Sequence, residues 1–313
     1  MTEHTVKPER YPATHPSSNA ASGSTVRGGP ADAVRARRRQ TGPEVWRPRA
    51  TVPRSAGPRP AAPVERDQPL VSVVMPCLNE RDSVGRCVRA ARAGLAAAGV
   101  PGEVVVADNG STDGSRRVAA QAGAWVVREP RRGYGNAYLA GFAAARGHYL
   151  VMGDSDCSYD FGELPRLLDP LRGGRADYVL GSRFAGDIRP GAMPWTHRRI
   201  GNPVLTRMLN RLFGLRTTDA HSGMRAFTRA AYERMAPRQG GMELASELVV
   251  AAAASGLRVR EVPITYHPRT GTSKLHSLRD AARHVRFMLG YAARLRAGKP
   301  PACTPGNGVD PRP

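Results

Sequence analysis

The sequence is short of lysine, of cysteine and of long apolar runs. Lysine occurs only at positions 7, 274 and 299, so nearly all of the 47 basic residues are arginine. The four cysteines have neither the spacing of a metal site nor the density of a disulfide scaffold, which fits a reducing cytoplasm. No stretch reaches the roughly 18 apolar residues that a membrane-spanning helix needs. The sequence therefore predicts a soluble or peripheral protein.

Motifs of several other protein classes are missing too. The histidines show no ligand spacing such as His-Glu-x-x-His, and no Gly-x-Ser-x-Gly elbow is present, so neither a zinc enzyme nor a serine hydrolase is expected. The formal net charge is +21, yet zinc-finger, RNA-binding and helix-turn-helix patterns are absent, which argues against nucleic acid as a partner. A basic protein of this kind can instead bind an anionic membrane or phosphorylated substrates.

The two ends of the chain differ in composition from the rest. Residues 1–66 are rich in proline, alanine, glycine, serine and arginine, carry 12 basic against 5 acidic residues, and show no apolar periodicity. Such a segment cannot bury enough apolar surface to offset its conformational entropy, so we expect a disordered extension of undetermined role. Residues 298–313 are rich in proline and glycine and are expected to form a flexible tail. The prediction is one folded domain over residues 67–297.

Strand and helix signals alternate within that domain. We expect strands at 70–75, 103–107, 124–128, 148–152 and 177–180, the first closed by Pro76, with helices at 81–98 and up to 146 among others. This alternation predicts an α/β fold with a mostly parallel sheet flanked by helices. Polar clusters follow the first, second, fourth and fifth strands. Because the carboxyl ends of parallel strands share one edge, these clusters are expected to converge there.

Residues 151–156 (Val-Met-Gly-Asp-Ser-Asp) are the most informative stretch. An apolar run of this kind is typical of a buried parallel strand, and two carboxylates follow it at the edge where open α/β sheets bind ligands. Carboxylate oxygens suit Mg²⁺ or Mn²⁺, and these ions commonly bridge protein carboxylates and substrate phosphates. The alternative is a solvated aspartate-rich turn.

Three segments together resemble glycosyltransferase family 2 in their order and spacing. They are residues 76–80 (Pro-Cys-Leu-Asn-Glu), 108–114 (Asp-Asn-Gly-Ser-Thr-Asp-Gly) and 154–156 (Asp-Ser-Asp). Later segments at 219–225, 241–247, 261–264 and 269–275 are similar to the dolichol-phosphate mannosyltransferase and polyprenyl-phosphate glycosyltransferase branch. The resemblance covers about residues 71–289. It implies a GT-A (Rossmann-like) fold, a nucleotide sugar donor, and Mg²⁺ or Mn²⁺ as cofactor.

The resemblance also implies a role for individual residues. Expected nucleotide-binding residues are Pro76, Leu78, Asn79, Glu80, Asp108 and Asp154. Asp154 and Asp156 are the expected metal ligands, with Asp156 the more direct one and Ser158 a poorer ligand nearby. Expected phosphate-binding residues are Arg183, Arg269, Ser273 and Lys274. Asp156, Arg225 and Lys274 are the expected catalytic residues, with Arg225 facing the active site.

Some assignments stay open at this level. Asn109 stands where the family often has a second aspartate, which leaves the choice between GDP and UDP donors undecided. Asp113 could contact the nucleotide or only cap a helix, and Arg183 could instead pair with a structural carboxylate. Glu243 and Glu247 could contact the donor sugar or orient arginines.

The segment 278–295 carries apolar residues at helical spacing with arginines on its other faces. A basic amphipathic helix of this kind can lie in an anionic membrane interface. The alternative is a terminal helix packed on the sheet.

The expected function is inverting transfer of a hexose from GDP-mannose or UDP-glucose to a polyprenyl or dolichyl phosphate, at the inner, cytoplasmic face of the membrane. A lipid phosphate is charged at pH 7 and can attack without a strong general base. A hydroxyl acceptor would need one, such as Asp219 or Glu247. The alternatives are a soluble family 2 enzyme acting on a saccharide or small-molecule hydroxyl, and a non-catalytic basic binding protein. The oligomeric state is open.

Overall fold

The structure is a computed structural model that describes residues 69–271 and 277–298. The expected extension over residues 1–66 lies outside the described residues, and so does the expected tail beyond residue 298. Within the described residues the chain follows the predicted α/β pattern, with strands and helices alternating through its first half.

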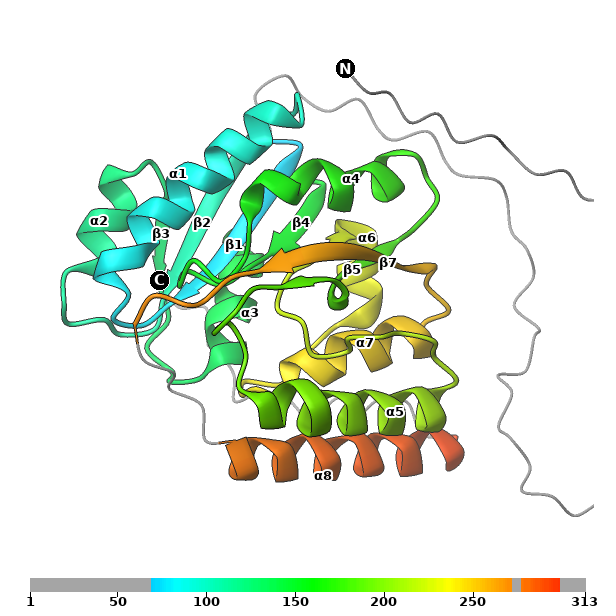
Figure 1. The fold of residues 1–313 in the computed structure, drawn as a ribbon. Coiled ribbons are helices and arrows are strands. Elements are labelled where there is room, and N and C mark those ends of the chain that lie inside the picture. Colours follow the sequence, from blue (N-terminus) through cyan, green and yellow to red (C-terminus); the bar gives the residue numbers. More distant parts are fainter. Residues whose placement is uncertain (1–68, 272–276, 299–313) are drawn as a thin grey trace, which may run out of the picture. The chain divides into compact units, whose positions relative to one another are not determined.

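Seven strands in the described part of the chain form one mixed sheet (Figure 1). They are β1 (Val71–Cys77), β2 (Gly102–Asp108), β3 (Trp125–Arg128), β4 (Tyr149–Met152), β5 (Tyr178–Ile188), β6 (Arg225–Thr228) and β7 (Val259–Tyr266). Their spatial order is β3-β2-β1-β4-β6-β5-β7. Only β6, among these seven, runs antiparallel to its neighbours, so the prediction of a mostly parallel sheet is confirmed.

Two strand ends differ from the prediction. Pro76 does not close β1, because the strand continues to Cys77 with Pro76 opposite Ala107. Proline removes only an N–H donor, and its carbonyl still accepts a 2.6 Å hydrogen bond from Ser155 Oγ. The fifth strand runs on to Ile188, so Arg183 lies within β5 rather than after it.

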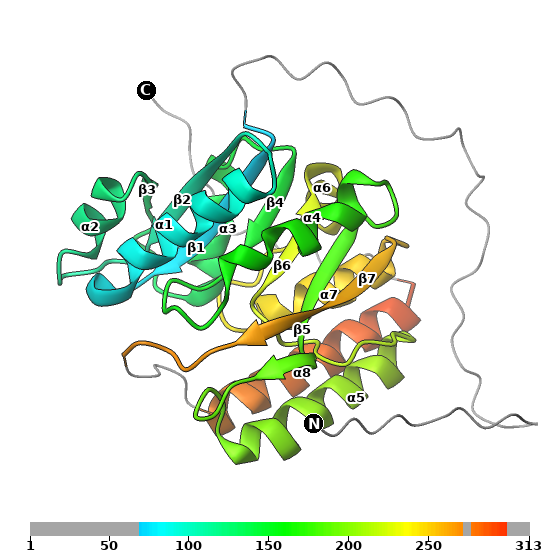
Figure 2. The same ribbon diagram turned by 45° about the horizontal axis from the view of Figure 1, so that its top comes forward.

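Helices cover both faces of the sheet (Figure 2). They are α1 (Arg81–Ala97), α2 (Ser115–Gln121), α3 (Tyr134–Ala144), α4 (Leu164–Arg172), α5 (Asn202–Phe213), α6 (Arg229–Met235), α7 (Leu244–Ala254) and α8 (Ser277–Arg296). Two short turns precede α4 and α5, the 3₁₀ turn η2 (Phe161–Glu163) and the π turn η3 (His197–Gly201).

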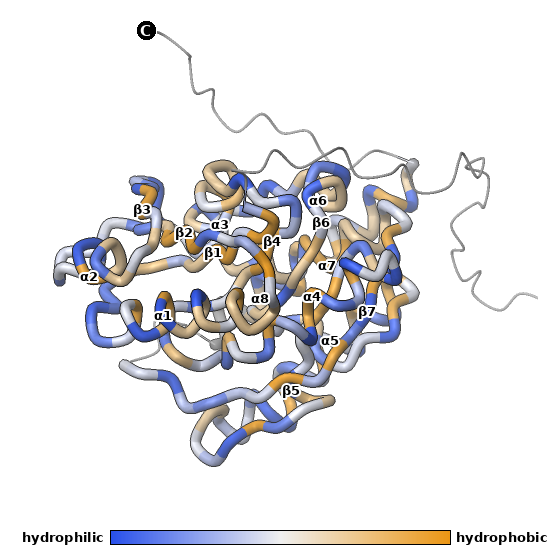
Figure 3. The backbone as a smooth tube through the Cα atoms, turned by 90° about the horizontal axis from the view of Figure 1, so that it is seen from above, coloured by the Kyte–Doolittle hydropathy of each residue, from blue (hydrophilic) through white to orange (hydrophobic). Residues whose placement is uncertain are grey.

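The core is divided between the two faces of the sheet. Successive strand residues point to opposite faces, so Val73 packs with α1, α2 and α4, while Val74 packs with α3, α7 and their neighbours. Strand β4 is mostly apolar and is buried after its first residue, and the hydropathy colouring shows it as largely hydrophobic (Figure 3). A strand buried on both faces is fixed in position, and it holds the residues that follow Met152 in one place.

Helix α8 is a packed terminal helix, although it packs against helices rather than the sheet. Met288, Tyr291 and Ala292 are buried, and the Tyr291 ring lies 6.0 Å from that of Phe213 on α5. The two helices run side by side in Figures 1 and 2. None of the helices in residues 69–271 and 277–298 is long and apolar enough to cross a membrane.

Candidate active site

The loops after β1 and β2 are tied together at one edge of the sheet. The backbone N–H of Asn79 donates to Ser111 Oγ, and Asn79 Oδ1 accepts from the N–H of Thr112, both at 2.9 Å. Asn79 has a φ of 51°, a left-handed conformation that asparagine tolerates better than most residues. The N–H of Glu80 donates to Ser115 Oγ. The predicted convergence of the first two polar clusters is therefore present.

Asp108 and Asn109 shape this edge from the end of β2. The buried Asp108 carboxylate accepts from the N–H groups of Gly110 and Ser111 and lies 3.7 Å from Arg116. The Asn109 amide donates to the carbonyls of Glu129 and Arg131, while its oxygen accepts from the N–H of Gly133. An aspartate at position 109 could not donate these two bonds, so the asparagine has a structural reason independent of the nucleotide base.

Asp113 makes the contacts at helix starts that one of its two predicted roles requires, while a nucleotide contact stays a prediction. Its carboxylate accepts from the N–H of Ser115 at the start of α2 and from the N–H of Arg81 at the start of α1. It thereby holds the first turns of both helices beside the loop.

Asp154 lies directly after β4 and is held by two tyrosines. The hydroxyls of Tyr134 and Tyr138, one turn apart on α3, both donate to Asp154 Oδ1 at 3.2 and 3.1 Å. The other oxygen lies beside Gly223, where an added Cβ would come within 3.0 Å of it. Burial, together with the charge of Asp156, raises the pKa of Asp154 to about 7. The site therefore concentrates negative charge where little water can screen it.

Asp156 connects this acidic pair to a loop more than a hundred residues further on. Its Oδ1 accepts from the N–H and hydroxyl of Ser158, and its Oδ2 lies 3.1 Å from Arg269. Arg269 is also 3.9 Å from Glu80, and the N–H of Thr270 donates to the Asp156 carbonyl. Residues expected after β1 and β4 therefore lie together with the expected phosphate-binding loop.

The residues present fit a divalent cation. The described residues hold no cluster of three or more histidine, cysteine, aspartate or glutamate side chains that could form a metal site by themselves. The buried Asp156 and the partly buried Asp154 offer two hard oxygen donors, and a cation would offset the charge of Asp156 that raises the pKa of Asp154. Asp154 Oδ2 faces the space beside Gly223, which a larger residue would fill. Ser158 already donates its hydroxyl to Asp156, so it acts here as an orienting group for the carboxylate.

The raised pKa of Asp154 predicts a pH-dependent affinity for metal. A metal needs the ionised carboxylate, so below pH 7 a proton competes with it, and Mn²⁺ affinity should fall about tenfold per pH unit. Without metal, the stability contribution of Asp154 is present at acidic pH and is lost as the pH rises through about 7, because the folded pKa lies above the unfolded one. Calorimetric titration with Mn²⁺ between pH 5.5 and 8.5 measures the metal affinity. An affinity that stays flat across that range would contradict the assignment of Asp154 as a ligand.

Arg183 shows the alternative that the sequence left open. It forms a two-point pair with the fully buried Asp219, at 2.7 and 2.8 Å, and its guanidinium lies over the Tyr266 ring. Glu261 in turn accepts from the backbone N–H groups of Thr218 and Asp219. Nε and Nη2 of Arg183 are thus paired with the carboxylate of Asp219, and a phosphate contact of Arg183 stays a prediction.

The structure disagrees with the expected role of Arg225. The side chain is fully buried on β6 and donates to the carbonyls of Ser222, Ala220 and Ala245 and to the Tyr178 hydroxyl. These four hydrogen bonds tie neighbouring loops and α7 to the sheet. A guanidinium whose donors are satisfied in the interior is a structural element and not a phosphate ligand.

Arg225→Ala should therefore act on folding. Removing the side chain leaves three buried carbonyls without donors, and we expect a loss of about 3–5 kcal/mol in the free energy of unfolding. Urea denaturation followed by circular dichroism measures it, with the exposed Arg216→Ala as the matched control. A variant as stable as the wild type, but unable to use the acceptor, would restore the original assignment.

The two glutamates of the segment 241–247 are also engaged by the protein. Glu243 pairs with Arg283 of α8 at 2.6 Å, so it orients an arginine, as one alternative held. Glu247 accepts from the backbone N–H groups of Arg238 and Gln239, and burial raises its pKa. Ser273 and Lys274, expected beside Arg269, lie outside the described residues.

Sequence reasoning missed the tyrosines that hold Asp154. Tyr134 and Tyr138 stand four residues apart on the helix that follows Gly133, so they share one face of α3. Burial, and then the charge of Asp154, raises the pKa of both hydroxyls well above the ordinary value, so they remain donors. The sequence signal that could have indicated this contact was a pair of tyrosines four residues apart after a glycine.

Comparisons with known proteins agree with this arrangement. Residues 72–236 match the model of glycosyl transferase family 2. The low-salt glycan biosynthesis hexosyltransferase Agl6 of Haloferax volcanii is 51% identical over 221 residues, 71% of this chain and 53% of that protein. The chain thus spans about half the length of that relative. The dolichyl-phosphate hexose transferase of the same organism is 35% identical over 175 residues, 55% of this chain and 73% of that protein.

A solved structure shows the same architecture. The glucosyl-3-phosphoglycerate synthase of Mycobacterium tuberculosis, crystallised with Mn²⁺, UDP and phosphoglyceric acid, gives a TM-score of 0.56 at 23% identity, over 75% of this chain and 80% of that one. The mixed sheet, its flanking helices and this likeness define a GT-A fold. With residues 72–236 matching the family model, the chain belongs to glycosyltransferase family 2 and is a glycosyltransferase.

Proposed function

We propose that this enzyme transfers a hexose from a nucleotide sugar to a polyprenyl phosphate, with the help of Mg²⁺ or Mn²⁺. The proposal rests on the cluster of Asp154, Asp156, Arg269 and Glu80. This cluster brings carboxylate oxygens suited to a metal and the positive charge of the arginine side chain together at one edge of the sheet. The relatives add support, since one is named a hexosyltransferase and another a dolichyl-phosphate hexose transferase.

The donor would lie across the loops after β1, β2 and β4. The nucleoside would be bordered by Asn79, Glu80 and Asp108. Asp154 and Asp156 would hold the cation that binds the diphosphate. The cation supplies charge neutralisation of the leaving diphosphate. Tyr134 and Tyr138 fix Asp154, and Ser158 fixes Asp156, so the carboxylates need little reorganisation when the donor binds. Arg269, with Lys274 from the same loop, would contact the phosphates.

The contacts of the two candidate general bases favour a phosphate acceptor over a hydroxyl acceptor. The two candidate bases are occupied, Asp219 by Arg183 and Glu247 by backbone amides. A phosphate oxygen is already ionised at pH 7 and needs no base. Direct attack on the anomeric carbon would invert the configuration of the donor.

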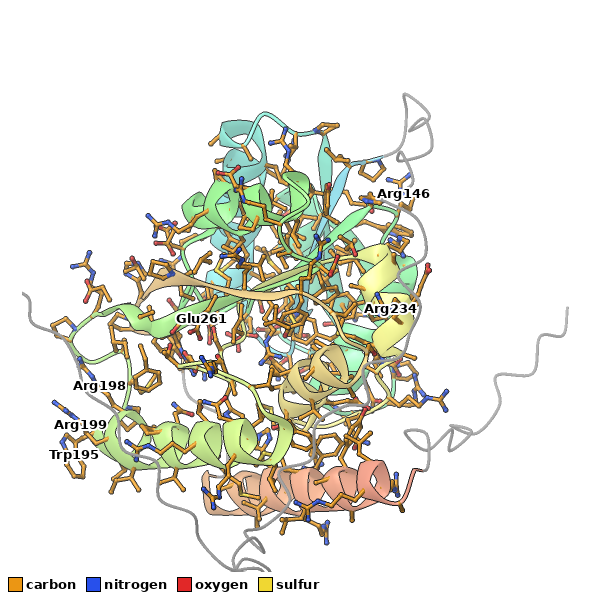
Figure 4. All side chains as sticks on the ribbon, turned by 90° about the vertical axis from the view of Figure 1, so that its right-hand side faces the viewer. Arg146, Trp195, Arg198, Arg199, Arg234 and Glu261 are labelled. Atoms are coloured by element: carbon orange, nitrogen blue, oxygen red, sulfur yellow. The ribbon has the colours of Figure 1, made fainter. Side chains whose placement is uncertain are left out.

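An exposed apolar and basic surface suggests where the lipid lies. Around η3 and the start of α5, the side chains of Trp195, Ile200 and Val204 are exposed, and Arg198 and Arg199 project beside Trp195 (Figure 4). Residues 188–218 contain six arginines and no acidic residue. Apolar side chains among arginines suit an anionic lipid surface, and we propose that this surface contacts the cytoplasmic face of the membrane.

Trp195→Ala should weaken binding to anionic vesicles roughly tenfold to a hundredfold, because burying an exposed large apolar side chain in the interface contributes roughly 1.5–3 kcal/mol. Co-sedimentation with phosphatidylglycerol-rich vesicles measures it. Trp125→Ala is the matched control, since Trp125 is also exposed. Its ring lies under Arg146, which Figure 4 shows on the opposite side of the picture from Trp195. Equal losses in the two variants would remove the case for this surface.

The function itself is tested by incubating the enzyme with radiolabelled GDP-mannose or UDP-glucose, Mg²⁺ and polyprenyl phosphate, then extracting the lipid. Label in the lipid phase that disappears with EDTA supports the proposal. Label on a saccharide or other hydroxyl acceptor instead favours the soluble family 2 alternative. Failure to turn over any donor would favour the non-catalytic alternative.

A further inference from the structure

Two cysteine side chains meet at the turn of residues 154–157, which carries the proposed metal ligands Asp154 and Asp156 and is called the metal-binding turn below. Cys87 lies on the buried face of α1, and Cys157 follows Asp156 in the chain. Their sulfur atoms are 3.4 Å apart, although 70 residues separate them in the sequence. Both are free thiols, as is Cys77 beside Ser111. Packing has thus placed two reducing groups in contact at the edge of the site.

The two thiols differ in their access to solvent. Cys87 is only 2% exposed, whereas Cys157 is half-buried at the end of the turn. Cys157 has a φ of 65°, a left-handed conformation that costs a residue with a side chain on the order of 1 kcal/mol. This conformation accompanies the contact between its sulfur and α1. A small oxidant from solvent therefore meets Cys157 first, with Cys87 behind it.

We propose that Cys87 and Cys157 form a modification site, a dithiol that hydrogen peroxide converts into a disulfide. The Cys157 sulfur attacks one peroxide oxygen, forming an S–O bond while the O–O bond breaks, and the departing hydroxide takes a proton to become water. The Cys87 sulfur then attacks the sulfur of the sulfenic acid, forming the S–S bond while the S–O bond breaks, and the departing hydroxide takes the Cys87 thiol proton and leaves as a second water. The two thiols lose two electrons and two protons, and the peroxide is reduced to two waters.

The disulfide would displace the metal-binding turn. A disulfide needs sulfur atoms at about 2.05 Å, so one or both cysteines must move by roughly 1 Å in total. Cys157 is bonded to Asp156, whose carbonyl accepts from the Thr270 N–H and whose carboxylate contacts Arg269. Because a displacement of about 1 Å at reacting groups can cost roughly a hundredfold, oxidation should slow sugar transfer. This effect rests on the proposed function, whereas the disulfide itself does not.

The test uses the full-length wild-type protein and hydrogen peroxide. After oxidation, the protein is alkylated under denaturing, non-reducing conditions and mapped by mass spectrometry. We expect a peptide linking Cys87 to Cys157 that has lost the mass of two hydrogen atoms. Sugar transfer should fall at least tenfold and return after dithiothreitol. The mapping result stands even if the substrate assignment fails, so the two proposals are tested separately.

Matched variants locate the reaction. Cys77→Ala and Cys303→Ala should still form the link, whereas Cys87→Ala should leave Cys157 as a sulfenic acid that dimedone labels. The absence of the Cys87–Cys157 peptide from the oxidised wild type overturns the site. A complete disulfide that leaves transfer unchanged overturns its effect on the metal-binding turn.

Discussion

Replacing Asp156 with asparagine should lower turnover by about a thousandfold while the protein stays folded. The amide keeps the size of the side chain, and its oxygen can still accept from Ser158, so the turn after β4 should persist. What is lost is a charged ligand for the cation that neutralises the leaving diphosphate, a contribution of several kcal/mol to transition-state stabilisation. Steady-state kinetics at saturating Mg²⁺, beside a thermal melt, measure the two expectations.

The control for this variant is Asp187→Asn. Asp187 is an exposed aspartate on β5 that pairs only with Arg189 in a solvent-accessible ion pair, so its loss should change turnover little. Near-normal turnover in Asp156→Asn, with metal dependence retained, would show that the metal is held elsewhere.

Arg269→Ala should give the second largest effect. It should lower the rate of sugar transfer without lowering the affinity for metal. Arg269 contacts Asp156 and Glu80 in the structure, and we propose that it also contacts the donor phosphates. Loss of one preorganised charged contact costs roughly a hundredfold in rate. Metal affinity should not fall, because the arginine competes with the cation for Asp156.

Kinetics with the donor varied, together with Mn²⁺ titration, test this pair of outcomes. Arg260→Ala on β7 is the matched control, since Arg260 is exposed in the strand that leads to the same loop. If Arg269→Ala loses metal binding and activity to the same degree, Arg269 supports the Asp156 turn and does not act on the phosphates.

Much of the site's position could be predicted from local sequence patterns. An apolar run ending in Asp154 and Asp156 indicates a buried strand, and the geometry of parallel sheets then brings its end beside the loops after β1 and β2. The contact between Arg269 and Asp156 was not predictable in the same way, because it depends on how the chain leaves β7 and folds back over α1. Local patterns carry no information about that path.

Arg225 and β6 show where sequence reasoning fails for a physical reason. The family resemblance implied that Arg225 faces the active site, yet its partners are mostly backbone carbonyls, which every residue type offers. The four-residue strand that carries it is too short to show an alternating pattern. Its antiparallel direction follows from pairing with β4 and β5, a long-range contact.

The proposed metal-dependent transfer to a phosphate oxygen can be tested by one paired measurement. The same enzyme, donor and Mg²⁺ are given either polyprenyl phosphate or the polyprenol that lacks the phosphate, in matched vesicles. We expect labelled lipid only from the phosphate, with the anomeric configuration opposite to that of the donor, and we expect the label to be lost with EDTA. Equal labelling of polyprenol, or transfer that persists in EDTA, would contradict it.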